Sequence, residues 1–594
     1  MGLLTLRSLA PLIAAALFAA TNAHAQVAAG IPPDQASTYR IDLAKHYFAS
    51  PDAERAALAT LDSVLARLDA FEGRLGQSPA ALEQALQLGD AVRVELLRHS
   101  AYLALRGWAD TRDASSAQRL QDLNARTILR TRFVTVEVRA LNAATLARFY
   151  RERPLLRRYA FAIDEMRASP EPRLRLTEAE ANLLQRVSPL VEQWQGEMYN
   201  RLFARRVDVQ QDEDAYAYLL LSRARAGNLI ASLRGAPVAA ALAYRERHLS
   251  ATDVRATTAA LAARAELNTR YERARIAHVR RAVGRENILY YSDYLAPPAG
   301  DAVPRFTIAE ARAVIERALA PLGAEYMEEL RALLDPANGR LDIAPGPYRA
   351  PGAFTPATAL GAGASVFYSS GFTGTFADVV SLAHEGGHAV QYELMRRAAV
   401  LPAYASGAPW LAESIAYFNE LVLADHLYRT DTSPARQAFY LEQLVDREMQ
   451  AISHARDVAF EEALYSGVAR GTLGSAAGLN TLFDSIGTRY SAWHGLDPEL
   501  KRHWIRIPHY FRAPFYRVNY MYGRLLAIRY FDMYRRDPSA FVPRFLALLR
   551  AGNSAPPNEL LLQHLGIRMN GPALVADAAP LLEAHLAELE ARYR

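Results

Sequence analysis

Hydrophobic residues in the first half of the chain recur at intervals of three and four positions. Between residues 42 and 281 the sequence is rich in Ala, Leu, Arg and Glu, as in the stretch LDSVLARLDAFEGRL. A period near 3.6 residues is typical of amphipathic helices. We therefore predict packed helices over this half, interrupted at Pro170, at Pro172 and in the charged stretch at residues 205–214.

The pattern changes between residues 336 and 375. Gly and Pro cluster in PANGRLDIAPGPYRAPGAF, and the short run SVFYSSGF follows. Turn-forming residues break helices, and aromatic and β-branched residues favour strands. We predict loops and a few short strands here, beside an active centre, and helices again from Phe376 to the C-terminus. The expected fold is predominantly α-helical with a small β element.

Composition and charge narrow the possible classes of protein. The 594 residues are 51% hydrophobic, which is enough for a large buried core. The 68 Lys and Arg nearly balance the 63 Asp and Glu, and no long basic run is interleaved with aromatics, so nucleic acid is not an expected partner. Cys is absent, which excludes disulfides, a Cys nucleophile and thiolate zinc sites. A metal site must therefore use His and carboxylates.

The N-terminus has the pattern of an export signal. Arg7 precedes the apolar run LAPLIAAALFAA, and the small residues of Ala23-His24-Ala25 place cleavage before Gln26. A buried helix or a membrane anchor is the alternative, but Pro11 interrupts the run, which is short for a span of about 20 residues. We expect a signal peptide at residues 1–25, a periplasmic or secreted mature chain, and no membrane attachment after cleavage.

The stretch FADVVSLAHEGGHAVQYELM carries the strongest chemical signal. His384 and His388 are four residues apart, which on a helix places both imidazoles on one face. Glu385 projects roughly 100° round the helix from His384, so it can reach a metal-bound water without taking a coordination position. Catalytic zinc takes three protein ligands and keeps the fourth position for that water.

The third ligand is expected from the stretch WLAESIAYFNEL, which follows a chain reversal. It offers Glu413, and Glu420 lies two turns further on the same face. Glu420 is placed to accept the second ring N–H of a ligating His, as outer carboxylates do at metal sites. We predict one zinc ion per chain, bound by His384, His388 and Glu413.

An accidental His-Glu-x-x-His on a surface helix is the alternative. Gly386 and Gly387 each lower helix propensity by about 1 kcal/mol relative to Ala, which indicates a close backbone approach at this point. The apolar flanks indicate a buried helix, where two unpaired imidazoles and a carboxylate would cost free energy. These two features favour a metal site.

Residues 378–389 read DVVSLAHEGGHA, and Glu413 begins ESIAYFNE, 25 residues past His388. These motifs resemble those of the oligoendopeptidase F branch of the thimet oligopeptidase family, peptidase family M3, with Ala416 where that family often has Ser. The resemblance implies His384, His388 and Glu413 as zinc ligands. Glu420 and Asp378 are the expected supporting carboxylates.

The resemblance continues through the C-terminal part of the chain. His509 in the IPHY run, Tyr516 and Tyr520 are similar to a C-terminal segment of the family. We expect these three residues to donate hydrogen bonds to the tetrahedral oxyanion. An ordinary aromatic core cluster is the alternative for each tyrosine. Similarity to the family covers roughly residues 200–594. Within this part, the similar segments also include residues 278–297, 351–354, 374–375 and 552–560.

The resemblance implies a gluzincin-type zincin with a bilobal helical body, split by a deep channel with zinc at its floor. The expected organisation is a signal peptide at 1–25, a helical region at 26–205 and a catalytic domain at 206–594. The implied activity is hydrolysis of short unstructured peptides, with Glu385 as general base. We expect a monomer or a weak oligomer.

Two other functions remain open from the sequence. An exported carboxydipeptidase of the angiotensin-converting type is also helical and also combines His-Glu-x-x-His with a distant Glu. The 25-residue spacing and the Phe-Asn-Glu register at residues 418–420 favour the oligopeptidase. A non-catalytic, zinc-stabilised peptide-binding protein would be expected to lack Glu385, which is present.

Overall fold

The computed structural model describes residues 30–168, 194–204, 212–283, 303–356 and 363–594, together with residues 180, 183, 187, 191 and 291. The expected signal peptide at residues 1–25 and the expected domain boundary at 205/206 lie outside these described residues. Within the described part of the chain, no helix combines the length and the apolar character that a membrane span requires.

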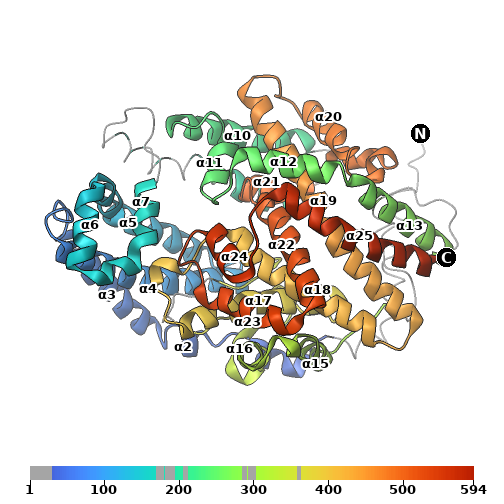
Figure 1. Cartoon of the computed structure of the whole chain (residues 1–594), viewed down its shortest axis with the longest axis horizontal. Coiled ribbons are helices and arrows are strands. Elements are labelled where there is room, and N and C mark those ends of the chain that lie inside the picture. The colour runs from blue at the N-terminus through green and yellow to red at the C-terminus, as the bar shows by residue number, and fades with distance from the viewer. Residues whose placement is uncertain are drawn as a thin grey trace, which may run out of the picture.

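A group of N-terminal helices lies at one end of the long axis, drawn blue to cyan in Figure 1. Its members are α3 (Pro51–Asp69), α4 (Pro79–Ala109), α5 (Ala114–Ala140), α6 (Ala143–Glu152) and α7 (Ala160–Ala168). Leu61, Leu65 and Leu68 recur at helical spacing on α3 and are fully buried in the core of this group, against which Leu401 and Ala403 also pack. The helices predicted from the apolar period are confirmed here.

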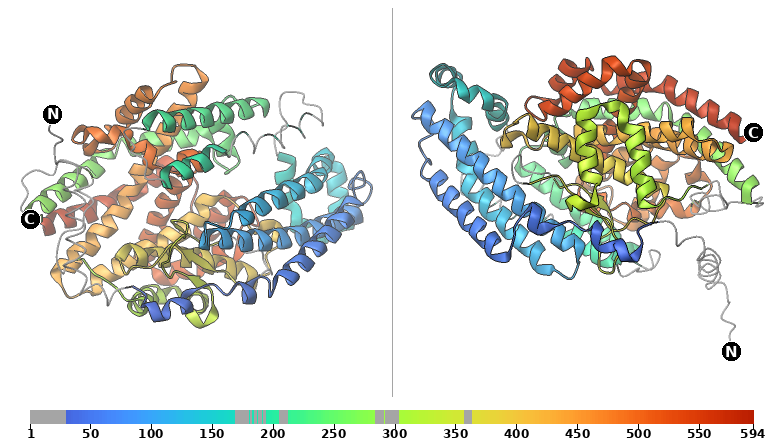
Figure 2. Two further views of the ribbon diagram at one scale, coloured as in Figure 1. Left: turned by 180° about the vertical axis from the view of Figure 1, so that it is seen from behind. Right: turned by 90° about the horizontal axis from the view of Figure 1, so that it is seen from below.

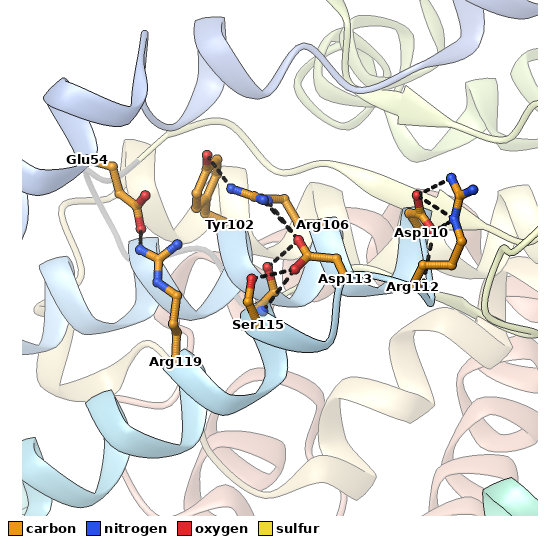
Figure 3. Close-up of polar contacts among 9 residues, drawn as sticks. Glu54, Tyr102, Arg106, Asp110, Arg112, Asp113, Ser115 and Arg119 are labelled. Carbon is orange, nitrogen blue, oxygen red and sulfur yellow. Dashed lines mark hydrogen bonds and ion pairs between the residues drawn. The ribbon is translucent and has the colours of Figure 1, made fainter.

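The turn between α4 and α5 is held by side-chain contacts (Figure 3). The Asp113 carboxylate accepts a hydrogen bond from the backbone N–H of Ser116, 3.1 Å away, and so caps α5. It also accepts from Arg106 Nη2 of α4 at 2.9 Å. Arg119 of α5 pairs with the buried Glu54 of α3. These contacts fix α5 against α3 and α4.

The rest of the chain forms one larger helical body with a continuous core. Its helices are α9 (Trp194–Ala204), α10 (Glu213–Leu233), α11 (Ala239–Arg245), α12 (Ala251–Ala262), α13 (Ala265–Val283), α15 (Ile308–Leu319), α16 (Ala324–Leu334), α17 (Phe376–Arg397), α18 (Pro409–Thr430), α19 (Pro434–Ala469), α20 (Ala476–Gly487), α21 (His509–Arg512), α22 (Arg517–Arg536), α23 (Pro538–Ala551), α24 (Pro557–Leu565) and α25 (Gly571–Tyr593). The short helix α2 (Leu43–His46) leads into the N-terminal group. Figure 2 shows that group beside the larger body in both views.

Short 3₁₀ turns connect many of these helices. They are η2 (Pro33–Tyr39), η3 (Pro154–Tyr159), η4 (Ala320–Leu322), η5 (Pro336–Asn338), η6 (Pro402–Tyr404), η7 (Ala492–Gly495) and η8 (Pro498–Arg506).

A small sheet lies between α16 and α17 in the chain. It consists of β1 (Leu341–Asp342), β2 (Ala353–Phe354) and β3 (Phe367–Ser369) in the order β1-β3-β2. β3 is parallel to β1 and antiparallel to β2, with Phe354 opposite Tyr368. The predicted loops with a few strands are confirmed, as is the expected predominantly helical fold with a small β element.

Near the centre of the molecule, α18 packs against α17 and against α22 (Figure 1). A Cβ added to Gly387 would lie 3.0 Å from the Ala416 Cα and 3.1 Å from the Asn419 Nδ2 of α18. A Cβ added to Gly523 of α22 would lie 2.9 Å from the Cβ of Glu413. The close backbone approach that the glycines of α17 indicated is therefore confirmed.

Gly387→Ala should destabilise the protein by about 1–3 kcal/mol, because the new methyl group meets the backbone of α18, which cannot move alone. Gly386→Ala is the matched control. Its methyl group would meet Leu330 Cδ1 at 2.8 Å, the end of a flexible side chain, so a change below about 1 kcal/mol is expected. Urea unfolding followed by circular dichroism compares the two variants. Equal stabilities would show that α17 and α18 can separate without cost.

Candidate metal centre

Three side chains from two helices converge on one point. His384 and His388 of α17 and Glu413 of α18 each offer a ligand atom, and these atoms lie within 4.8 Å of one another. His384 Nε2 is 3.6 Å from Glu413 Oε2. Ligands at about 2.0–2.2 Å from one zinc ion are separated by roughly 3.3–3.6 Å in a tetrahedral site. The structure therefore brings together the three residues that the sequence indicated, and they can hold a metal ion.

Burial perturbs the ionisable groups of this cluster. It lowers the pKa of His388 to about 3, which leaves a neutral imidazole able to bind a metal ion. It raises the pKa of Glu413 to about 7 and also raises the pKa of Glu385. Glu385 is only 7% exposed, and its Oε2 has no hydrogen-bond partner among the described residues. Because unpaired buried carboxylates cost free energy, a bound cation fits this donor set.

Glu420 supports His384 from behind. Its Oε1 lies 2.7 Å from His384 Nδ1, so a proton on Nδ1 leaves Nε2 free to face a metal ion. The other carboxylate oxygen accepts from Arg524 Nη1 at 3.1 Å and lies 3.4 Å from Arg447 Nε. Burial opposes ionisation of Glu420, but Arg524 and His384 lower its pKa to about 2. Glu420 therefore occupies the place expected from its spacing.

Asp378 has a different place from the one expected. Its carboxylate accepts hydrogen bonds from the backbone N–H groups of Thr373 and Thr375, at 2.9 and 3.0 Å. Thr375 is the N-cap of α17 and accepts in return from the Asp378 N–H, which completes a capping box. Six residues of helix separate Asp378 from His384, a rise of roughly 9 Å. The structure thus assigns Asp378 to helix capping, which corrects its expected role as a carboxylate beside the metal.

The three candidate ligands and Glu385 line a cavity of about 740 Å³. Phe354 and Thr355 reach it from the sheet, and Thr355 Oγ1 donates to the backbone carbonyl of Glu385 at 3.3 Å. Trp108, at the end of α4, lines the same cavity. The sheet therefore lies beside the metal centre, and the N-terminal helices contribute part of its wall.

The C-terminal residues singled out in the sequence also line this cavity. The hydroxyl group of Tyr520 is 3.1 Å from His509 Nε2, and the hydroxyl group of Tyr516 donates to Glu413 Oε1 at 3.0 Å. Burial raises the pKa of both tyrosines and, with Arg517, lowers the pKa of His509 to about 4. Near neutral pH the tyrosines are therefore protonated hydrogen-bond donors and His509 is uncharged.

Sequence reasoning missed Glu461, which holds the turn before Tyr516. Phe515 has a φ of 59°, which a residue with a side chain rarely adopts, and its N–H donates to Glu461 Oε1 at 2.8 Å. Glu461 is fully buried on α19, and burial raises its pKa to about 8. A carboxylate at an apolar position of a helix was the available signal.

Tyr417, Arg447 and Arg524 were also missed. Tyr417 lines the cavity, and the guanidinium of Arg524 lies 3.6 Å from the centre of its ring. Nothing in the local sequence distinguishes either arginine from a solvent-exposed one.

No protein-family model matches the chain. Oligopeptidase PepF of Bacillus subtilis is 24% identical over 301 residues, which are 50% of this chain and 44% of PepF. The match thus spans less than half the length of that relative. Two crystal structures have a similar fold over almost the whole chain. A protein from Chlamydophila abortus has a TM-score of 0.71 at 19% identity and covers 93% of this chain and 98% of its own.

The other crystal structure is oligoendopeptidase-F from Enterococcus faecium, with a TM-score of 0.65 at 19% identity, over 91% of this chain and 98% of its own. The helical body with a small sheet is therefore the fold of M3-type peptidases. By distant sequence homology to PepF and by this fold, the chain is similar to oligoendopeptidase F-like peptidases. The resemblance inferred from its motifs is confirmed.

The raised pKa of Glu461 predicts a specific pH dependence of stability. Below its ordinary pKa of 4.5 the carboxyl group is protonated in both states, and its contribution to stability is then complete. Between 4.5 and about 8 the folded state binds more protons, so stability should fall as pH rises and level off above about 8. Glu461→Gln keeps an acceptor for the Phe515 N–H and cannot titrate, so its decline should be shallower. Urea unfolding from about pH 5 to about pH 8 measures both slopes. Equal slopes would mean that Glu461 stays ionised in the folded protein.

Proposed function

We propose that the protein is a zinc-dependent oligopeptidase that hydrolyses peptide bonds in short unstructured peptides. The observation that carries the proposal is the buried Glu385 Oε2, which has no partner among the described residues and belongs to a side chain lining the cavity of His384, His388 and Glu413. The names of the homologue PepF and of the Enterococcus faecium structure support the substrate class.

The residues of the cavity divide the work of hydrolysis. His384, His388 and Glu413 would hold a zinc ion, which when bound would supply Lewis-acid polarisation of the substrate carbonyl group and would lower the pKa of a water towards about 7. Glu385 takes a proton from the attacking water as its oxygen bonds to the carbonyl carbon. The same carboxyl group then gives the proton to the amine nitrogen as the C–N bond breaks. Burial, which raises the pKa of Glu385, makes it a stronger base for this transfer.

His509 and Tyr520 are the proposed donors to the oxygen on which negative charge develops. Both line the cavity and already lie within hydrogen-bonding distance of each other. Tyr516 is engaged with Glu413 and is proposed to hold that ligand in place. Donors fixed before the reaction stabilise the transition state without a cost of reorganisation.

The proposal includes a bilobal body with a channel between residues 26–205 and 206–594. A second cavity of about 400 Å³ between the N-terminal helices and the larger body supports it, because that cavity shares residues 406–408 and Asn553 with the metal cavity. Short peptides are the proposed partners, with no nucleic acid.

The first test separates ligand from base. Glu385→Gln should keep one zinc per chain and lose on the order of a hundredfold or more in turnover, because the amide cannot accept the proton. Glu413→Ala should lose metal and activity together. Elemental analysis and hydrolysis of a fluorogenic peptide, with and without a chelator, measure both. Full zinc occupancy in Glu413→Ala would remove Glu413 from the ligand set, and near-normal turnover in Glu385→Gln would require another base.

The second test concerns the oxyanion donors. Tyr520→Phe should lower kcat by on the order of a hundredfold with little change in KM, because its hydrogen bond strengthens only as charge develops. His509→Ala should act similarly. Tyr530→Phe is the control, since Tyr530 lies on the same helix with its hydroxyl 3.2 Å from Ser414 Oγ and does not line the cavity. An unchanged kcat in well-folded Tyr520→Phe would assign Tyr520 to packing.

Export also belongs to the proposal, because of the cleavage pattern at Ala23-His24-Ala25. N-terminal sequencing of the protein from a periplasmic or secreted fraction should begin at Gln26. Recovery of the intact chain from Met1 in the cytoplasm would contradict export and leave the peptidase activity untouched.

A further inference from the structure

A second cavity of about 400 Å³ lies between the N-terminal helices and the larger body. Helices α4, α5 and α7 form one wall, and residues 403, 404 and 406–408 with Asn553 form part of the other. Its volume is in the range of sites that hold one small ligand or one large side chain. None of the residues assigned to metal binding or to catalysis lines it.

Most of the wall is apolar, and most of its polar groups already have partners. Leu86, Leu96 and Phe161 belong to the apolar part of the lining. The Asp90 carboxylate accepts a hydrogen bond from the Tyr159 hydroxyl at 2.7 Å. Glu165 lies 3.4 Å from His248 Nε2. Thr127 and Thr131 donate to backbone carbonyl groups of their own helix. A ligand here would meet a largely apolar surface.

Arg93 is the exception among the charged residues of this wall. It is an exposed residue of α4, about one turn after Asp90, on whose carboxylate its charge acts, and it makes no hydrogen bond or close ion pair with any described residue. A guanidinium has five N–H donors in a planar fork, which matches a carboxylate. Its charge is therefore available to an anionic group that enters the cavity.

The second cavity adjoins the metal cavity. Ser406, Gly407, Ala408 and Asn553 line both. A Cβ on Gly407 would lie 2.2 Å from Asn553 Oδ1, so the absence of a side chain at Gly407 permits the close approach of this shared wall. Because the two cavities lie on either side of these residues, a peptide bound at the metal centre that passes round the shared wall would reach the second cavity with a more distant residue.

We infer that the second cavity binds the C-terminal residue of a peptide, with a bulky apolar side chain between α4 and α5 and the terminal carboxylate on Arg93. The identity of the ligand as a peptide rests on the proposed function. The apolar walls select the side chain, and the unpaired guanidinium selects the free carboxylate over an amide.

Gly89 offers a clean way to fill the cavity. It lines the cavity from α4, and a Cβ added there would have no neighbour within 4 Å. Gly89→Leu should place an isobutyl group in the space, whereas Gly89→Ala adds one methyl group and serves as the matched control. Both replacements raise helix propensity, so neither is expected to destabilise α4. Arg93→Gln keeps a polar side chain and removes the charge.

The probe is a peptide of about ten residues, roughly 33–36 Å when extended. It is composed of Ala and Gly, ends in Phe, carries fluorescein at its N-terminus, and is prepared as free acid and as C-terminal amide. Fluorescence anisotropy in the presence of a chelator, which prevents turnover, measures binding to the full chain. The wild-type protein should bind the acid at least about tenfold more tightly than the amide. Arg93→Gln should remove this difference, and Gly89→Leu should weaken binding of both peptides by about tenfold, unlike Gly89→Ala.

Unchanged binding in Gly89→Leu would show that the cavity is only a gap in the packing. An unchanged ratio of acid to amide in Arg93→Gln would show that Arg93 does not bind the carboxylate. Either result overturns the inference even if the wild-type protein hydrolyses peptides. Conversely, if the wild-type protein cleaves no peptide yet shows the expected binding differences, the peptidase proposal fails and the second cavity remains a peptide site.

Discussion

The contact between α17 and α18 at Gly387 is the constraint on which the metal centre depends. Only a residue without a Cβ lets the Ala416 backbone come so close, and this approach brings Glu413 within reach of His384 and His388. A wider separation would move the carboxylate away from the two imidazoles. Gly523 of α22 likewise has no Cβ where it approaches α18. This close approach allows Tyr520 of α22 to line the same cavity. The close packing of α18 against its neighbours is therefore required both for the fold and for the arrangement of the candidate ligands.

The buried carboxylate of Glu420 is paired with cationic or hydrogen-bonding groups on both sides. Glu420 connects His384 on one side to Arg524 and Arg447 on the other, and these arginines come from α22 and α19. A buried carboxylate is tolerated when its hydrogen bonds are satisfied by opposite charges. Among the described residues, Glu385 Oε2 has no hydrogen-bond partner, and the contrast between the two carboxylates follows their proposed roles. One holds an orientation, whereas the other is kept free to exchange a proton.

The sequence predicted the elements whose signal is local. Helical periodicity predicted α3 to α7, and the Gly and Pro cluster predicted the loops around β1 to β3. The four-residue spacing of His384 and His388 predicted that they share one face of a helix, because the helix has a fixed geometry, whereas Glu413 was predicted from its motif after a chain reversal. Long-range partnerships were not predictable. Glu461 and Arg524 act through contacts with residues tens of positions away, and Asp378 matched a motif while its local chemistry, three residues after Thr375, is that of a cap.

The partners of Glu420 come from several helices, and this has a thermodynamic consequence for metal binding. The candidate ligands belong to α17 and α18, while the cations that orient Glu420 belong to α19 and α22. Four helices must therefore dock before a metal ion finds its full affinity, and the unfolded chain offers no comparable site. By linkage, an ion that binds the native state alone shifts the folding equilibrium towards it in proportion to the logarithm of its concentration. Metal content would then report how completely the four-helix centre has assembled.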